Sequence, residues 1–251
     1  FTAIADGLKA FMLFFFSRRN KNTKVIQALK LKPKKLKELA REYYDFPLYR
    51  SPQVFLNAVS QSLPVLLLTS FFGPASAGFY AIGRTVLSMP SSLIGKSVGD
   101  VFYPRIAEAY NNKENITNLI FKATLILAII GILPFGTIIL FGPFLFSFVF
   151  GSDWYMAGEY ARWTALWVYF MFINQPSVRS LPVLSAQGFH LKFTVVTLTI
   201  RILALSTGYF IFNSDIIAVA LFGITGAILN VLLILITLNI SRRKESSLHD
   251  S

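Results

Sequence analysis

The sequence predicts an all-α fold: a polytopic membrane helix bundle with six complete transmembrane helices and the end of a seventh. Of the 251 residues, 54% are hydrophobic and only 14% are charged, whereas about 25% of residues are charged in a typical soluble domain. Several apolar runs reach the roughly 18 to 20 residues that cross a bilayer core. Their hydrophobic residues do not alternate strictly, so helices rather than a closed β-barrel would satisfy the backbone in lipid.

Two segments precede the first complete span. Residues 1–16 have the composition of the end of a truncated transmembrane helix, from which we expect a fragment that lacks an N-terminal part. Residues 17–50 form a basic linker that holds eleven of the 24 Lys and Arg residues. Within it, Leu36, Leu39 and Tyr43 recur at helical spacing. This leaves two interpretations, a helix attracted to anionic lipid at the membrane surface or a solvated linker helix.

Six predicted spans then form a C-terminal transmembrane lobe over residues 51–240. Their approximate bounds are residues 52–72, 77–103, 119–141, 163–185, 193–212 and 216–240, and Pro176 and Pro182 interrupt the fourth span. Polar residues 104–116 predict a loop. Residues 142–162, which are half apolar and aromatic, predict a re-entrant or interfacial segment on the far face. Residues 241–251 form the predicted cytoplasmic tail.

Basic and aromatic residues orient these spans. The loops on the side of the linker carry Arg105, Lys113, Lys192, Arg242, Arg243 and Lys244, whereas the opposite loops carry only Arg162. Since loops rich in Lys and Arg are typically cytoplasmic, we expect the linker and the C-terminus in the cytoplasm. The aromatic residues that predict a belt at the opposite membrane interface are Trp154, Tyr155, Tyr160, Trp163 and Trp167.

Arginines inside the spans are the main candidates for function, because an ionised side chain in lipid is costly and needs a partner or a wet cavity. Arg84 lies seven residues in from the outer end of its span, roughly 10 Å deep. Arg201 lies near the middle of its span, and Arg179 lies between Pro176 and Pro182. We expect all three arginines to face a cavity inside the bundle.

Uncharged polar residues add to this predicted cavity. Gln53, Asn57 and Gln61 recur every four residues and form one stripe on the first complete span. Few acids lie within the spans, and the planar fork of Arg suits phosphate and carboxylate, so we expect an anionic substrate. The predicted binding residues are Arg84, Arg179, Arg201, Asn57 and Gln61. The structural alternative is that the arginines pair with backbone carbonyls or with residues of the missing part.

Lys96 and Asp100 form a separate candidate pair. They are four residues apart, so they share one helix face, and they lie near the cytoplasmic end of their span. An ion pair there would fix the depth of the helix, with the Lys96 side chain extending toward the interface. We expect this anchoring role, and the alternative is a contribution to function.

The sequence lacks the patterns of catalytic and metal sites. It contains no cysteine, and its two histidines, His190 and His249, stand alone and are predicted to face solvent. No glycine-rich nucleotide loop is present. The net charge of +12 is concentrated in the linker without interleaved aromatic residues, so we expect no nucleic acid partner. We therefore predict no enzymatic activity, no metal and no cofactor, with an H+ or Na+ gradient as the candidate energy source.

Two stretches carry a resemblance to a known family. The first is AGFYAIGRTVLSMPSSLIGKSVGDVFYPRIAEAYNN at residues 77–112, and the second is FGPFLFSFVFGSDWYMAGEYARWTALWVYF at residues 141–170. Their order, with YPR near the inner face and then FG and Trp outside, resembles the C-terminal half of Wzx-like polysaccharide and O-antigen flippases over residues 50–240. These flippases belong to the multidrug/oligosaccharidyl-lipid/polysaccharide exporter superfamily.

The resemblance implies two six-helix lobes that alternate access around a central cavity, in the cytoplasmic membrane of a bacterium or archaeon. It implies that a lipid-linked oligosaccharide is flipped from the inner to the outer leaflet. The implied partners are this polyprenyl-pyrophosphate-linked glycan, membrane lipids and the N-terminal lobe of the same protein. The pyrophosphate would suit Arg84, Arg179 and Arg201.

Two other functions stay open at this point. A cation-coupled multidrug antiporter of the same superfamily would need acids in the cavity, and Asp100 is the one acid within the six predicted spans. A membrane scaffold without a transport role would leave the stripe of Gln53, Asn57 and Gln61 without a purpose. The flippase is therefore the preferred prediction.

Overall fold

The computed structural model describes residues 51–112 and 114–249, and all regular structure in these ranges is helical. The predicted truncated helix at residues 1–16 and the basic linker at residues 17–50 lie outside the described residues. The helices in chain order are α4 (Ser51–Phe72), α5 (Pro74–Asn111), α6 (Ile116–Phe150), the 3₁₀ helix η2 (Ser152–Trp154), α7 (Tyr155–Ile173), α8 (Gln175–Ser180), α9 (Gln187–Phe210) and α10 (Asp215–His249).

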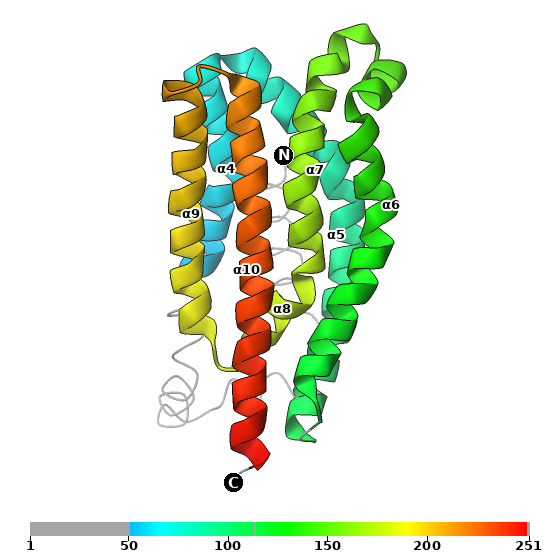
Figure 1. Ribbon diagram of the computed structural model, residues 1–251, viewed down its shortest axis with the longest axis vertical. Coiled ribbons are helices and arrows are strands. Elements are labelled where there is room, and N and C mark those ends of the chain that lie inside the picture. Colours follow the sequence, from blue (N-terminus) through cyan, green and yellow to red (C-terminus); the bar gives the residue numbers. More distant parts are fainter. Residues whose placement is uncertain (1–50, 113, 250–251) are drawn as a thin grey trace, which may run out of the picture. The chain divides into compact units, whose positions relative to one another are not determined.

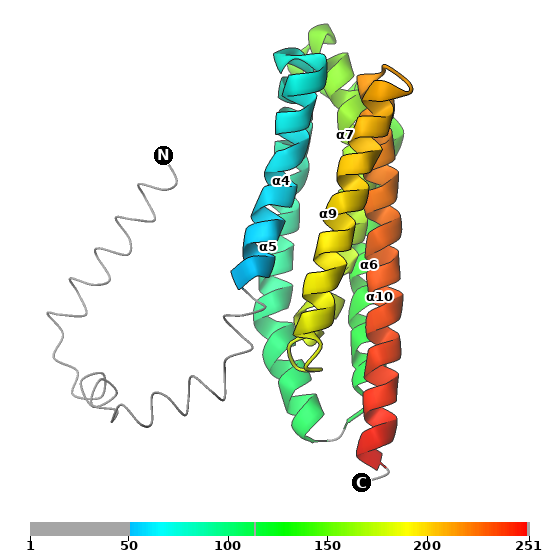
Figure 2. The ribbon, with the colours of Figure 1, turned by 90° about the vertical axis from the view of Figure 1, so that its left-hand side faces the viewer.

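The described helices form an all-α membrane helix bundle, as predicted. Four of them are long and apolar enough to cross a membrane, namely α4 from Pro52, α6, α9, and α10 as far as Ser246. Helices α5 and α7 run beside them (Figures 1 and 2). The outward face of α6 carries large apolar side chains such as Leu133, 80% exposed, and Phe148, 78% exposed. A continuous apolar surface of this kind suits contact with lipid.

Two helices extend beyond the spans that the sequence predicts. Helix α5 continues to Asn111 through polar residues expected to form a loop, because Ile106 and Ala109 are fully buried on one of its faces. They pack with Ile116 and Ile120 of α6 in one apolar cluster. Helix α10 likewise continues to His249, through most of the residues predicted to form a tail.

Of the two interpretations of residues 142–162, the re-entrant segment is wrong, while the interfacial segment stays a prediction. Helix α6 continues to Phe150, and only η2 separates it from α7 (Figure 1). Gly151, with φ of 102°, ends α6 in a conformation that favours glycine. The two halves of the segment then pack on each other as neighbouring helices, and Phe146 and Ala157 are buried between them.

A break separates α7 from α8 and interrupts the fourth predicted span, as its prolines predict. Helix α7 ends at Ile173, and α8 begins with Gln175 and Pro176. At the break, Asn174 Nδ2 donates a hydrogen bond to Asn230 Oδ1 of α10 at 2.9 Å. This contact ties the break to α10, and α8 then packs against α5.

Glycines bring α7 close to its neighbours α5, α6 and α10. A Cβ atom on Gly158 of α7 would lie 2.4 Å from the Cα of Pro143 in α6, and one on Gly223 of α10 would lie 2.3 Å from the carbonyl oxygen of Trp163. A Cβ atom on Gly83 of α5 would lie 3.1 Å from a Cβ atom of α7. Gly83 and Gly223 belong to the stretches GFYAIG and FGITGA, whose small-residue spacing favours close helix packing of this kind.

Polar contacts hold both ends of α10 to other helices. At its start, the Asp215 carboxylate accepts hydrogen bonds from Ser76 Oγ of α5 at 2.8 Å and from Tyr160 Oη of α7 at 2.5 Å. Near its end, the Glu245 carboxylate accepts from the backbone N–H of Thr117 at 2.7 Å and from Thr117 Oγ1 at 3.1 Å. The second contact satisfies an N–H of the first turn of α6 that has no partner within the helix.

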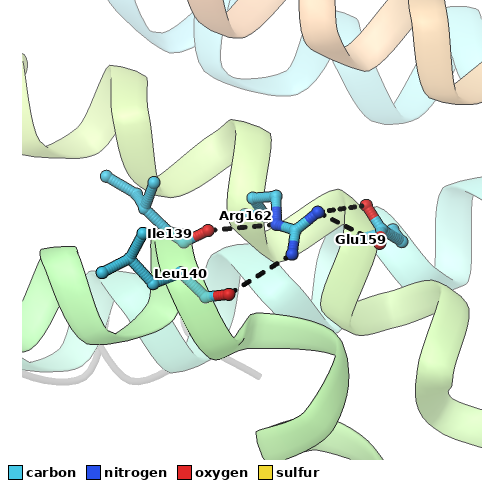
Figure 3. A network of polar contacts seen from close by, with 4 residues as sticks. All are labelled: Ile139, Leu140, Glu159 and Arg162. Atoms are coloured by element: carbon cyan, nitrogen blue, oxygen red, sulfur yellow. Dashed lines mark hydrogen bonds and ion pairs between the residues drawn. The ribbon is translucent and has the colours of Figure 1, made fainter.

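Arg162 of α7 compensates for a proline in α6 through hydrogen bonds to two backbone carbonyl groups, which Figure 3 shows. Pro143 has no N–H, so the carbonyl of Ile139, four residues earlier, loses its helical donor. Arg162 Nε donates to that carbonyl oxygen at 3.0 Å, and Nη2 donates to the carbonyl oxygen of Leu140 at 3.3 Å. Nη1 forms an ion pair with Glu159 at 3.3 Å. Arg162, the one basic residue of the predicted outer segment, therefore serves the packing of α6 on α7.

Replacing Arg162 tests this compensation. Arg162→Met should lower the free energy of unfolding by about 1 to 3 kcal/mol, because the Ile139 carbonyl loses a charged donor. In a Pro143→Ala background the loss should be smaller, since a backbone N–H at position 143 then supplies the helical donor. Thermal unfolding of the four proteins in detergent measures the coupling between the two sites. An equal loss in both backgrounds would contradict the compensation.

The close approach of α6 and α7 gives a second test. Gly158→Ala should destabilise the protein by about 1 to 3 kcal/mol, because the new Cβ overlaps the backbone of Pro143. Gly136→Ala on α6 is the matched control, since no heavy atom lies within 4 Å of its Cβ position. The control should change stability by less than about 1 kcal/mol. Similar unfolding temperatures for the two variants would rule out the close contact.

Candidate functional site

The residues of the polar stripe predicted on α4 contact two different neighbouring helices. Gln53 is 2% exposed, and its Nε2 donates to His190 Nδ1 of α9 at 2.5 Å. Gln61, two turns further on, accepts hydrogen bonds from Arg84 of α5. Asn57, between them, is exposed. The structure thus uses the two ends of the stripe to hold α4 against α9 and α5.

His190 is buried, so the prediction that it faces solvent is wrong. Helix α9 begins at Gln187 and already includes His190, which is 7% exposed. Contact with α4 through Gln53 covers the imidazole. The side chain of His249 lies outside the described residues.

Helices α4, α5, α7 and α8 surround a cavity of about 340 Å³. Its lining consists of Gln61, Arg84, Ser88, Ser91, Ser92, Gly95, Trp167, Val168, Met171, Phe172, Gln175 and Arg179. The wall formed by α5 is polar, and the wall formed by α7 is apolar and aromatic. A small number of polar groups against an apolar wall is typical of ligand-binding sites.

Arg84 reaches this cavity from α5 and is held by neutral groups. Its Nη1 donates to the backbone carbonyl oxygen of Gln61, and its Nη2 donates to Gln61 Oε1 at 3.0 Å. Among the residues that the structure describes, no carboxylate forms an ion pair with Arg84. Its positive charge is therefore not neutralised by a described neighbour.

Arg179 reaches the same cavity from the last turn of α8. The break at Asn174 makes this possible, because it lets α8 leave the line of α7 and approach α5. At Gly95 of α5, a Cβ atom would lie 3.9 Å from the Gln175 side chain. The structure therefore brings together Arg84, Arg179 and Gln61, three of the predicted binding residues, while Asn57 lies outside the lining.

Arg201, predicted near the middle of its span, lies behind the cavity rather than in its lining. Only 6% of its surface is exposed, and its Cζ lies 3.9 Å from the ring centroid of Trp167 and 4.1 Å from that of Phe222. Its Nη1 donates to Ser60 Oγ of α4 at 3.2 Å. Guanidinium groups are attracted to aromatic faces, and Trp167 lies inside the bundle, where it is 3% exposed. Its predicted position in an interfacial belt is wrong.

Lys96 and Asp100 lie on α5, past the turn that contributes Gly95 to the cavity. Both side chains lie outside the described part of the structure. The ion pair and its anchoring role therefore stay predictions.

The charge of the lining determines what the cavity favours. It contains two arginines and, among its described residues, no Asp, Glu or His. Arginine donates bidentate hydrogen bonds to oxyanions, and serine hydroxyls add neutral donors. The cavity therefore suits an anionic group such as phosphate or carboxylate. In the described ranges, no cluster of three or more His, Asp or Glu residues is arranged to hold a metal ion.

A family model described as polysaccharide biosynthesis protein matches residues 23–158, more than half of the chain. The chain belongs to this family. The match includes all of α4, α5 and α6, and therefore the side of the cavity that carries Gln61, Arg84 and the serines. Comparison with curated proteins and with solved structures gives no match.

Two features of the cavity in this polysaccharide biosynthesis protein were not predicted. Ser88 and Ser91 follow Arg84 at four and seven residues, so the spacing that identifies the stripe on α4 could have found them on α5. No spacing in the sequence identifies the residues of the apolar wall in the same way. Trp167 looks like an interfacial residue in the sequence, and only the rotation of α7 against α6 and α10 turns it inward.

The absence of cysteine from this family member gives a direct test of the cavity. Ser88→Cys should react in membranes with a water-soluble maleimide, because the reactive thiolate forms where water is present. Leu133→Cys is the matched control on the apolar face of α6, where lipid should suppress the reaction. Labelling is measured by the gain in mass. Equal labelling at the two positions would contradict a wet cavity beside a lipid-facing surface.

Proposed function

We propose that this polysaccharide biosynthesis protein is a flippase that moves lipid-linked oligosaccharide from the inner to the outer leaflet of the cytoplasmic membrane. One observation carries the proposal: Arg84 and Arg179 line one cavity from different helices, with no acid among the described lining residues. The resemblance of residues 50–240 to Wzx-like flippases supports the same function, as does membership of the family.

The anionic part of the proposed substrate is the pyrophosphate that joins the polyprenyl chain to the glycan. Each guanidinium group offers paired N–H donors to phosphoryl oxygens. The serines of α5 suit the remaining phosphoryl oxygens or the first sugar hydroxyls. The volume of about 340 Å³ is near the lower end of the roughly 300 to 1,000 Å³ of ligand sites. The cavity thus suits the pyrophosphate and an adjoining sugar, while the polyprenyl chain stays in lipid.

Transport requires that the substrate be released as well as bound. At an effective dielectric constant of about 20, opposite unit charges 4 Å apart attract each other by about 4 kcal/mol. Gln61 offers Arg84 two neutral oxygen acceptors, which hold the guanidinium when no phosphate is present. Exchange between Gln61 and phosphate oxygens would keep binding reversible. A second lobe on the N-terminal side and an H+ or Na+ gradient complete the proposed alternating-access cycle.

The described lining disfavours the alternative of a cation-coupled multidrug antiporter. A cationic drug would meet two arginines and no described acid, and like charges repel. The side chain of Asp100, the acid that this alternative needs, lies outside the described residues. Efflux of a cationic drug that depends on Asp100 would support the antiporter instead.

Removing the two charges of the cavity tests the flippase. Arg84→Gln and Arg179→Gln should each lower surface polysaccharide by about tenfold or more, because a hydrogen bond to a charged group is worth about 1.5 to 3 kcal/mol. The measurement is surface polysaccharide in cells whose sole copy of the full-length protein is the variant, at matched protein levels.

The control is Arg242→Gln, which removes the same charge from an exposed position on α10 outside the cavity. It should leave surface polysaccharide unchanged. A wild-type amount of surface polysaccharide in the double variant of Arg84 and Arg179 would contradict the proposal.

A further inference from the structure

Arg201 is a buried cation whose hydrogen-bond donors are only partly used. Its Nη1 donates to Ser60 Oγ, whereas Nε and Nη2 have no hydrogen-bond partner among the described residues. The hydroxyl of Tyr80, a residue with 0% exposure, also has none. Buried donors without acceptors cost free energy, more so when the donor is charged. Three such donors in one protein interior require an explanation.

Tyr80 and Arg201 share a neighbouring aromatic ring. Tyr80 of α5 packs edge-on against Phe222 of α10, with 6.3 Å between the ring centroids. Phe222 is in turn one of the two rings that cover the Arg201 guanidinium. Tyr80 and Arg201 therefore contact the same ring, and Arg201 also contacts Trp167 of the cavity lining.

Trp167 lies between Arg201 and the cavity. Its side chain lines the cavity, and its ring lies 3.9 Å from Arg201 Cζ. The rings of Trp167 and Phe222 both contact the guanidinium group. The groups of Arg201 that can still form hydrogen bonds are therefore its N–H groups. An oxyanion is the ligand that matches paired N–H donors of this kind.

We propose that Arg201 and Tyr80 form a second, occluded subsite for an oxyanion, which a phosphoryl group enters when the Trp167 indole moves aside. The oxyanion accepts hydrogen bonds from Arg201 Nε and Nη2 and from the Tyr80 hydroxyl, so that binding satisfies donors that are otherwise unpaired. This inference rests on the proposed function, because it takes the anion to be the pyrophosphate of the adjacent cavity. One phosphoryl group then lies at Arg84 and Arg179 and the other at Arg201.

Tyr80→Phe separates this role from a structural one. Removing a hydroxyl without a partner should leave the unfolding temperature of the empty protein unchanged or higher, whereas removing a donor to an anion should weaken pyrophosphate binding about tenfold. The measurement is calorimetric titration of the full chain in detergent with inorganic pyrophosphate. Tyr155→Phe, at an exposed tyrosine on α7, is the control and should keep wild-type affinity. Wild-type affinity in Tyr80→Phe would overturn the subsite.

The movement of Trp167 can be measured separately, by its fluorescence emission. The chain has three tryptophans, so Trp154→Phe and Trp163→Phe together leave Trp167 as the single emitter. Pyrophosphate should shift its emission, and Arg201→Gln in the same background should abolish the shift while weaker binding persists. Binding without any shift of Trp167 emission would overturn the occluded subsite.

The two proposals fail in different ways. Binding that is lost in Arg84→Gln but unaffected by Tyr80→Phe would support the cavity of the proposed function and overturn the subsite. No binding of pyrophosphate to the wild-type chain would overturn both. Loss of affinity in Tyr80→Phe with an unchanged unfolding temperature would support the subsite.

Discussion

Helix α7 lies against α6 and α10 at distances that leave no room for a side chain at the points of contact. Gly158 meets the backbone at Pro143, and Gly223 meets the carbonyl oxygen of Trp163. These contacts set the rotation of α7 and therefore the direction of Trp167, one turn past Trp163. Helix α7 supplies the aromatic wall of the cavity, and its Trp167 contacts Arg201. The break before α8 follows at the end of the same helix. The aromatic side of the site therefore depends on this packing.

Three arginines illustrate different ways of reducing the cost of a charge inside the bundle. Arg162 donates to carbonyls next to Pro143 and pairs with Glu159, so its charge and its donors are both matched. Arg201 is covered by aromatic faces but keeps donors without acceptors. Arg84 has only the neutral oxygens of Gln61. Since a matched charge has nothing left to offer a ligand, Arg162 reads as structural, whereas the other two retain the capacity to bind an anion.

The helical class and the centres of the spans follow from hydropathy, because the length of an apolar run is a property of the chain alone. The ends of the helices do not follow from hydropathy. Helix α5 continues past its predicted end because Ile106 and Ala109 are buried against α6, a partner that the local sequence does not reveal. Residues 142–162 likewise become a helical hairpin because their apolar side chains pack on each other. His190 is buried for the same kind of reason, through Gln53 on a distant helix.

By itself, the sequence determined that this protein is a helical membrane bundle with cationic and polar residues deep in its spans. Spacing along one helix also related Gln61 to Gln53, and could have related Ser88 to Arg84. Only the tertiary structure decided which of these residues meet. Arg84 and Arg179 share one cavity, while Arg201 lies behind Trp167. The physical reason is that depth and spacing belong to single helices, whereas the rotation of one helix against another is set by side-chain packing between them.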